Sequence, residues 1–161
     1  LIPAFSTSIE PPKLSSNEAA IFDEIKQCWS VISDFSRVDL WSKATAQKII
    51  AVLGETPADI NATIVEPTVE YPKWDDITET WIIDEKAQLS AKETAATYEI
   101  QQLLSVANEK IAPLQDAVDL GMATDSETAS LTKWKTYRVL VNRVTSQSGF
   151  PTNIDWPAMP E

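Results

Sequence analysis

The hydrophobic pattern of this 161-residue chain changes its period near Asp84. Residues 1–84 hold short runs rich in Val, Ile, Trp and Phe, and Asp, Asn, Pro and Gly separate these runs. Such runs predict short strands joined by turns. From residue 85 onward the apolar residues recur at helical spacing instead. The sequence therefore predicts an α+β fold with two domains, a small β-domain of hairpins over 1–84 and a helical domain over 85–161.

An internal repeat supports hairpins in the first domain. Residues 22–31 align with residues 74–83, because each segment reads aromatic, Asp, acid, Ile, and then has a tryptophan seven residues after the first aromatic residue. The first aromatic residue is expected to end one strand, and the tryptophan to open the return strand, where the two rings pair. Further strands are expected over 37–41 and 48–53, with Gly54 and Pro57 turning the chain.

The second domain is expected to open with a long helix over 84–112. Its apolar stripe has spacings of three and four residues, slightly looser than a strict heptad. Pro113 has no amide hydrogen for the interior of a helix, so the sequence predicts a kink or a restart there. The stripe consists of Ala96, Ile100, Leu103, Ala107, Ile111, Leu114 and Val118.

A second helix is predicted to follow and to form an αα-hairpin with the first. Gly121 suits a helix C-terminus, and Thr124-Asp125-Ser126-Glu127 has the pattern of a capping box. The second helix carries basic residues, and its expected partner carries Glu109, Asp116 and Asp119, so weak charge pairing between the helices is expected. Its apolar stripe consists of Trp134, Tyr137, Val141 and Val144, widened by Leu131 and Leu140; its basic residues are Lys133, Lys135, Arg138 and Arg143.

The last residues are predicted to form an extended, proline-rich tail. Pro151, Pro157 and Pro160 remove backbone donors and favour extended geometry. The apolar side chains of this tail pack either on the helical hairpin or on another chain, and we favour packing on the hairpin. These side chains are Phe150, Ile154, Trp156 and Met159.

The composition excludes several classes of partner. The chain has 24 acidic and 13 basic residues, a net charge of −11, which repels the phosphates of nucleic acids and anionic membrane surfaces. No apolar run is long enough to span a membrane, and the first residues lack the pattern of a basic segment followed by an apolar one, so neither a membrane span nor a signal peptide is expected. The sequence therefore predicts a soluble cytosolic protein that binds neither nucleic acid nor membrane.

The residues also argue against catalysis and against a resident metal or cofactor. There is no histidine, so the chain cannot form a catalytic relay that depends on imidazole. Cys28 is the only cysteine, so neither an internal disulfide nor a metal cluster held by several thiolates can form. The adjacent acids Asp75 and Asp76 are expected to be turn residues. A glycosidase with two catalytic carboxylates is a remote alternative, because the sequence places no suitable pair.

Four tryptophans in the first domain are the candidate partner-binding residues. Paired tryptophans on a small sheet can stack on sugar rings, which makes surface polysaccharide an alternative partner. The same residues can instead form the core of a domain too small for an aliphatic core, and we favour this interpretation. The four residues are Trp29, Trp41, Trp74 and Trp81.

Several uncommon clusters occur in an ordered pattern along the second domain. Residues 108–124 read Asn-Glu-Lys-Ile-Ala-Pro-Leu-Gln-Asp-Ala-Val-Asp-Leu-Gly-Met-Ala-Thr, residues 134–144 contain Trp-Lys-Thr-Tyr-Arg, and residues 154–157 read Ile-Asp-Trp-Pro. In this pattern the chain resembles the tail fibre assembly proteins of Mu-like and lambdoid phages and prophages. Residues 29–34, 54–57 and 71–75 resemble the family as well. The residues that carry the C-terminal motif are Trp134, Tyr137, Arg138, Arg143, Trp156 and Pro157.

The resemblance implies a chaperone for the trimeric tail fibre. The variable N-terminal domain is expected to bind the C-terminal tip of the fibre, and the helical domain to support self-association, in the host cytoplasm and without a cofactor. Retention on the virion as a carbohydrate-binding adhesin is the alternative. Family members begin ahead of the stretch Leu1-Ile2-Pro3-Ala4, so the resemblance also implies that an initial part of the β-domain is missing here.

Overall fold

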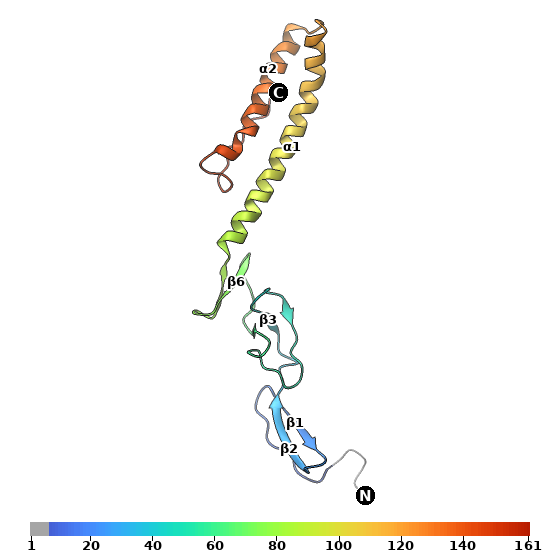
Figure 1. Ribbon diagram of the computed structural model, residues 1–161, viewed down its shortest axis with the longest axis vertical. Helices are drawn as coiled ribbons and strands as arrows, with labels where there is room; N and C mark the ends of the chain where they lie inside the picture. The colour runs from blue at the N-terminus through green and yellow to red at the C-terminus, as the bar shows by residue number, and fades with distance from the viewer. Residues whose placement is uncertain (1–6) are drawn as a thin grey trace. The chain divides into compact units, whose positions relative to one another are not determined.

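The computed structural model describes residues 7–161, and the chain divides into two compact units, Leu1–Asp84 and Glu85–Glu161. We call them the N-terminal unit and the helical unit. Strands and turns build the first, and two helices build the second (Figure 1), so the expected α+β class is confirmed. The stretch Leu1-Ile2-Pro3-Ala4 lies outside the described residues.

Within residues 7–84, the N-terminal unit contains three small antiparallel sheets. The first pairs β1 with β2, the second places β3 between β4 and β5, and the third pairs β6 with β7. The expected strands over 37–41 and 48–53 are shorter than predicted, and β5 was not predicted at all. The strands are β1 Glu18–Asp23, β2 Cys28–Ser33, β3 Leu40–Ser42, β4 Lys48–Ile49, β5 Ala62–Thr63, β6 Pro72–Asp75 and β7 Thr80–Ile83.

Both copies of the repeat form the predicted hairpins. Phe22 lies opposite Trp29, with ring centroids 5.1 Å apart at 62°. Trp74 lies opposite Trp81, with centroids 5.2 Å apart at 74°. Edge-to-face aromatic pairs of this kind contribute about 0.5–1.5 kcal/mol beyond the area they bury. Each pair therefore fixes the register of its hairpin.

The structure adds a third hairpin of the same construction, β3–β4. Trp41 lies opposite Lys48, again seven residues later, and the Lys48 ammonium lies 6.0 Å from the centre of the Trp41 ring. In all three hairpins the fifth residue after the aromatic residue has a positive φ: Gln27 at 51°, Ala46 at 56° and Glu79 at 51°. In the β3–β4 hairpin, the cation–π contact between Lys48 and Trp41 takes the place of the aromatic pair found in the other two hairpins.

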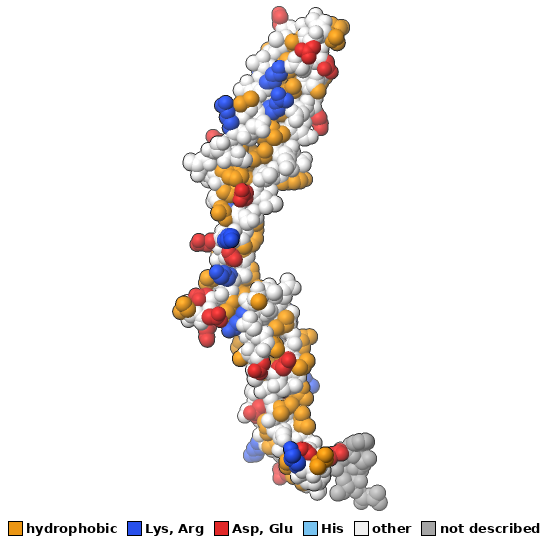
Figure 2. Space-filling model, in the orientation of Figure 1, with side chains coloured by type: hydrophobic (Ala, Val, Ile, Leu, Met, Phe, Trp, Pro, Cys, Tyr) orange, Lys and Arg blue, Asp and Glu red, His pale blue; other side chains and the backbone are white. Residues whose placement is uncertain are grey.

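The core of the N-terminal unit is small. Leu40, Ala51 and Ala62 are buried, and Phe35, Val38, Ile49 and Ile60 pack against them. Many other apolar side chains of this unit lie at the surface, where Figure 2 shows them interspersed with charged groups. Aromatic pairs and turn hydrogen bonds therefore stabilise much of this unit, because its buried aliphatic residues are few.

The helical unit consists of α1 Glu85–Asp119, α2 Asp125–Asn142 and a 3₁₀ turn, η1 Val144–Ser146, and α2 runs back along α1 (Figure 1). The predicted end of the first helix at residue 112 is wrong, because α1 continues through Pro113. The ring of Pro113 is exposed, while Ile111 is buried and Leu114 packs against the core. Packing on both sides of the proline compensates for the one hydrogen bond it removes.

The αα-hairpin turn follows the prediction. Gly121 has φ 68°, a left-handed conformation that glycine adopts without strain, and the Met122 amide donates to the carbonyl of Ala117 at 2.8 Å. Thr124 and Glu127 form a reciprocal capping box at the start of α2. The chain therefore reverses through local hydrogen bonds at both helix ends.

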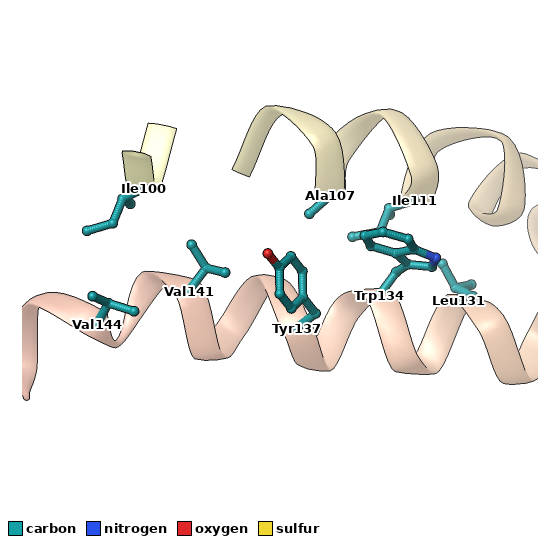
Figure 3. Packing of buried hydrophobic residues seen from close by; sticks show 8 residues of the cluster. All are labelled: Ile100, Ala107, Ile111, Leu131, Trp134, Tyr137, Val141 and Val144. Atoms are coloured by element: carbon teal, nitrogen blue, oxygen red, sulfur yellow. The ribbon is translucent and has the colours of Figure 1, made fainter. Parts of the chain in front are cut away.

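The helical core joins the two predicted stripes (Figure 3). Leu103, Leu104, Val106 and Leu114 pack around its buried members. Two residues of the predicted stripes are exposed instead: Leu140 on α2 and Val118 on the last turn of α1. Leu140 lies beside the buried Val141 on the exposed side of α2, and Val118 lies one residue before the end of α1. The buried members are Ile100, Ala107, Ile111, Leu131, Trp134, Tyr137, Val141 and Val144.

Residues 154–161 form neither helix nor strand. Phe150 and Ile154 pack against the helical core, as predicted. The Gln147 side chain holds this segment in place, since its amide donates to the Asp155 carbonyl at 2.7 Å and accepts from the Asp155 amide at 2.9 Å. Met159 is half exposed. The tail thus packs on the helical core through Phe150 and Ile154, and Trp156 lies at the surface in a shallow pocket that it lines together with Lys92 and Ala95 of α1.

No helix within residues 7–161 combines the length and the apolar character that crossing a bilayer requires.

Candidate partner-binding surface

The four candidate tryptophans lie in three different hairpins, so they form no single platform. Trp81 is buried, at 8% exposure, and its ring N–H donates to the Val65 carbonyl at 2.8 Å. Trp29 is half-buried, and its ring N–H donates to the Ile9 carbonyl at 3.0 Å. These two rings connect their hairpins to preceding segments of the chain, which is a structural role.

Trp74 belongs to a network between two hairpins of the N-terminal unit. Its ring N–H donates to Asp76 Oδ1 at 2.9 Å, and the Lys43 ammonium lies 4.8 Å from the centre of its ring. Lys43 also forms a salt bridge of 3.5 Å with Asp76. Lys43 follows β3, so this network connects the β3–β4 turn to the β6–β7 hairpin.

An open cleft of about 510 Å³ lies beside this network. Apolar side chains make up most of its wall, with Lys43 and Glu79 as the charged groups. A cleft of this kind suits a short apolar segment with a few polar contacts. The cleft is lined by Phe35, Lys43, Pro57, Ala58, Ala62, Thr63, Ile64, Val65, Trp74 and Glu79.

Asp23 and Asp75, the last residues of β1 and β6, accept hydrogen bonds from the turns that follow them. Asp23 Oδ1 accepts from the amides of Lys26 and Ile25, both at 2.9 Å. Asp75 accepts from the Thr78 hydroxyl at 2.8 Å and from the Ile77 amide at 3.0 Å. The Lys26 amide above all lowers the pKa of Asp23, and the Thr78 hydroxyl above all lowers the pKa of Asp75. Asp75 is the last residue of β6, and its carboxylate accepts hydrogen bonds from the turn that follows, while Asp76 lies in that turn, as predicted.

These turns expose two apolar side chains that the sequence analysis did not single out. Ile25 is 95% exposed and Ile77 is 93% exposed, at equivalent positions of the two aromatic hairpins. The signal was present in the repeat, since each copy has isoleucine three residues after its first aromatic residue. The sequence alone gave no measure of its exposure.

The residues of the C-terminal motif divide between core and surface. Trp134 and Tyr137 are buried, with ring centroids 5.7 Å apart at 88°. Burial, and then the Glu99 carboxylate, raise the pKa of Tyr137. Arg143 caps the end of α2, whereas Trp156 and Pro157 lie in the irregular C-terminal segment.

The predicted charge pairing between the helices is wrong. None of the salt bridges found among residues 7–161 joins α1 to α2. Arg138 donates instead to the side-chain oxygen of Asn108 at 2.9 Å, a neutral partner. An exposed ion pair gains little over hydration, so the register of the hairpin rests on apolar packing.

The charge of the chain is concentrated in the N-terminal unit. Residues 1–84 hold 14 of the 24 acidic residues but only 6 of the 13 basic ones. No group of three or more His, Cys, Asp or Glu residues able to hold a metal ion occurs between residues 7 and 161. The N-terminal unit therefore carries most of the net negative charge, although the cleft beside Trp74 has one basic and one acidic group.

Comparison with known proteins gives the family. A family model described as Caudovirales tail fibre assembly protein, lambda gpK, matches residues 23–161. The tail fiber assembly protein of Escherichia phage lambda is 37% identical over 160 residues, covering 99% of this chain and 79% of the relative. The prophage tail fiber assembly protein homolog TfaR of Escherichia coli K12 is 36% identical over 160 residues, covering 99% and 81%.

Another relative aligns with only about half of this chain. The tail fiber assembly protein U of Escherichia phage Mu is 44% identical over 78 residues, covering 48% of this chain and 38% of the relative. No solved structure matches this chain. The family model and the two long alignments agree with the predicted resemblance. The chain therefore belongs to the tail fibre assembly protein family of tailed phages.

Proposed function

We propose that this protein is an assembly chaperone that binds the C-terminal region of a trimeric phage tail fibre protein and promotes its folding and oligomerisation. Family membership supports a role in fibre assembly. The observation that carries the proposal is the N-terminal unit itself, in which hydrogen-bonded hairpins present large apolar side chains on an acidic surface. Such a surface suits association with another protein.

The proposed activity answers a physical difficulty of fibre folding. Intertwined trimeric strands depend on contacts between distant residues and on association of three chains, so they fold slowly and expose unpaired edges meanwhile. A chaperone that covers the fibre tip and aligns three chains would lower the entropic cost of starting in register. This role requires binding without turnover and no cofactor.

The helical unit is proposed to make contacts between chaperone copies. Its hydrophobic core is formed by residues of one chain. The outer side of α2, however, exposes Val139 and Leu140 between Lys135 and Arg143. An exposed apolar pair on a rigid helix can pack against a neighbouring chain. We propose that the chaperone acts in the host cytoplasm during assembly. Afterwards it either leaves the fibre or is retained on the virion.

Co-expression tests the proposal. The full chain is produced together with the C-terminal region of its tail fibre protein, and the soluble fraction is measured by size exclusion with light scattering. A soluble fibre trimer that forms only with this chain and elutes together with it supports the chaperone. A fibre that trimerises equally well alone rejects it.

The cleft beside Trp74 supports a second candidate function, an adhesin module that holds surface sugars at the fibre tip. An indole ring, an ammonium and a carboxylate line this cleft. Against it, Trp81 is buried and the Trp74 N–H is already bonded to Asp76. Quenching of tryptophan fluorescence by lipopolysaccharide oligosaccharide, lost in Trp74→Ala, would favour the adhesin.

A further inference from the structure

Two turns of the N-terminal unit each expose almost the whole side chain of an isoleucine. Ile25 lies between β1 and β2 and Ile77 between β6 and β7, each three residues after the first aromatic residue of its hairpin. Turn positions favour Gly, Asn, Asp and Ser, so a β-branched apolar residue is an unusual choice there. A lone exposed apolar residue needs no explanation, but the same residue at the same place in two hairpins forms a pattern.

The backbone around both isoleucines is fixed without a partner. Asp23 accepts from the Ile25 amide, and Asp75 accepts from the Ile77 amide. Below each turn a cross-strand aromatic pair locks the two strands together. A contact residue held in this way loses little conformational freedom when it binds. The backbone that carries the two isoleucine side chains is therefore already ordered before a partner binds.

The third hairpin provides an internal comparison. Its equivalent turn position is Ala44, and the preceding Lys43 reaches back to Trp74 and Asp76 within the N-terminal unit. That turn thus makes intramolecular contacts, while the other two expose their isoleucines. The β6–β7 turn takes part in this contact through Asp76 but still exposes Ile77, just as the β1–β2 turn exposes Ile25.

The charges beside the isoleucines specify the partner. Glu24 precedes Ile25 and Asp75 lies two residues before Ile77, in a unit that carries an excess of acidic residues. The neighbouring acids Asp23 and Asp76 are already paired with Lys26 and Lys43. We propose that Ile25 and Ile77 are the anchors by which the N-terminal unit docks on the tail fibre protein, in apolar sockets rimmed by lysine or arginine. This inference rests on the proposed function, and it names the contact residues.

The test uses the full chain carrying I25S and I77S together, co-expressed with the C-terminal region of the tail fibre protein. The amount of fibre that elutes with the chaperone is measured. We expect a loss of roughly tenfold or more, the change that about 1.4 kcal/mol of lost binding free energy produces. The matched control is I50S, because Ile50 is 77% exposed in the same unit but lies outside the turns.

Each outcome decides a separate question. Fibre capture by I25S/I77S at the unsubstituted level overturns the anchor assignment, and so does an equal loss in I50S, which would indicate nonspecific apolar contact. Failure of the unsubstituted chain to capture fibre rejects the proposed function and the anchors with it. If circular dichroism shows that I25S/I77S is unfolded, E24K decides instead: reduced capture by the folded variant supports a basic rim, and unchanged capture contradicts it.

Discussion

At the scale of single residues, the indole rings of the N-terminal unit hold the fold together. Trp81 is buried, contacts Trp74 edge to face and donates to the Val65 carbonyl. We expect W81A to lower the free energy of unfolding by about 3 kcal/mol, because the substitution removes a large buried ring and a hydrogen bond. Urea denaturation followed by circular dichroism measures this change.

The control for W81A is I50S, which removes an exposed side chain of the same unit. Its free energy of unfolding is expected to stay within about 0.5 kcal/mol of the unsubstituted chain. A W81A protein as stable as I50S would contradict the structural role of the Trp81 ring.

Glu127 provides a pH-dependent prediction at the same scale. The Thr124 amide donates to its carboxylate at 2.7 Å and the Thr124 hydroxyl at 2.9 Å, and these bonds lower the pKa of Glu127 below its ordinary value of 4.5. The stabilisation is therefore fully present above the unfolded pKa and is lost as the pH falls through the lower folded pKa.

We expect the stability difference between the unsubstituted chain and E127Q to be constant near neutral pH and to shrink as the pH falls below 4.5. Thermal unfolding of the two proteins across an acid series measures it. A difference that stays the same down to the most acidic pH would show that the ionised carboxylate contributes nothing to this cap.

At the scale of the elements, Pro113 is the clearest departure from local rules. It lies inside α1, where it removes the hydrogen bond to the Glu109 carbonyl, and its ring is exposed. We expect P113A to raise the free energy of unfolding by about 1–3 kcal/mol, because alanine restores the bond and favours the helix. A decrease on urea denaturation would show that the proline has a packing role.

The elements could be predicted where local signals agree with packing. The repeat predicted two hairpins, and the capping box and Gly121 predicted the helix reversal, because each depends on neighbouring residues. The β3–β4 hairpin was missed because Lys48 takes the place of the second aromatic ring. The continuation of α1 was missed because the packing of Ile111 and Leu114 on another helix outweighs the local effect of proline.

At the scale of the whole molecule, the sequence predicted the family and the charge, but the candidate surface only in part. The four tryptophans were chosen by residue type, and the structure uses three of their ring N–H groups within the N-terminal unit. Ile25 and Ile77 were missed because solvent exposure depends on the complete fold. The solvent exposure of each apolar side chain in the structure indicates which of them remain available to a partner.

The proposed self-association yields a prediction at this scale. L140K places a charge in the exposed apolar pair of α2, where Leu140 is 45% exposed and outside the core. We expect the variant to remain folded and to have a lower average mass in light scattering than the unsubstituted chain. L120K, at the exposed end of the helical hairpin, is the matched control and is expected to leave the mass unchanged; an unchanged mass in L140K would contradict the contact.

The most direct test of a fibre-binding N-terminal unit is hydrogen exchange of the full chain, alone and in complex with the C-terminal region of its tail fibre protein. Amides in exposed turns exchange quickly unless a partner covers them. We expect slower exchange on complex formation in the turns around Ile25 and Ile77. Protection confined to residues 85–161, with these turns unchanged, would contradict it.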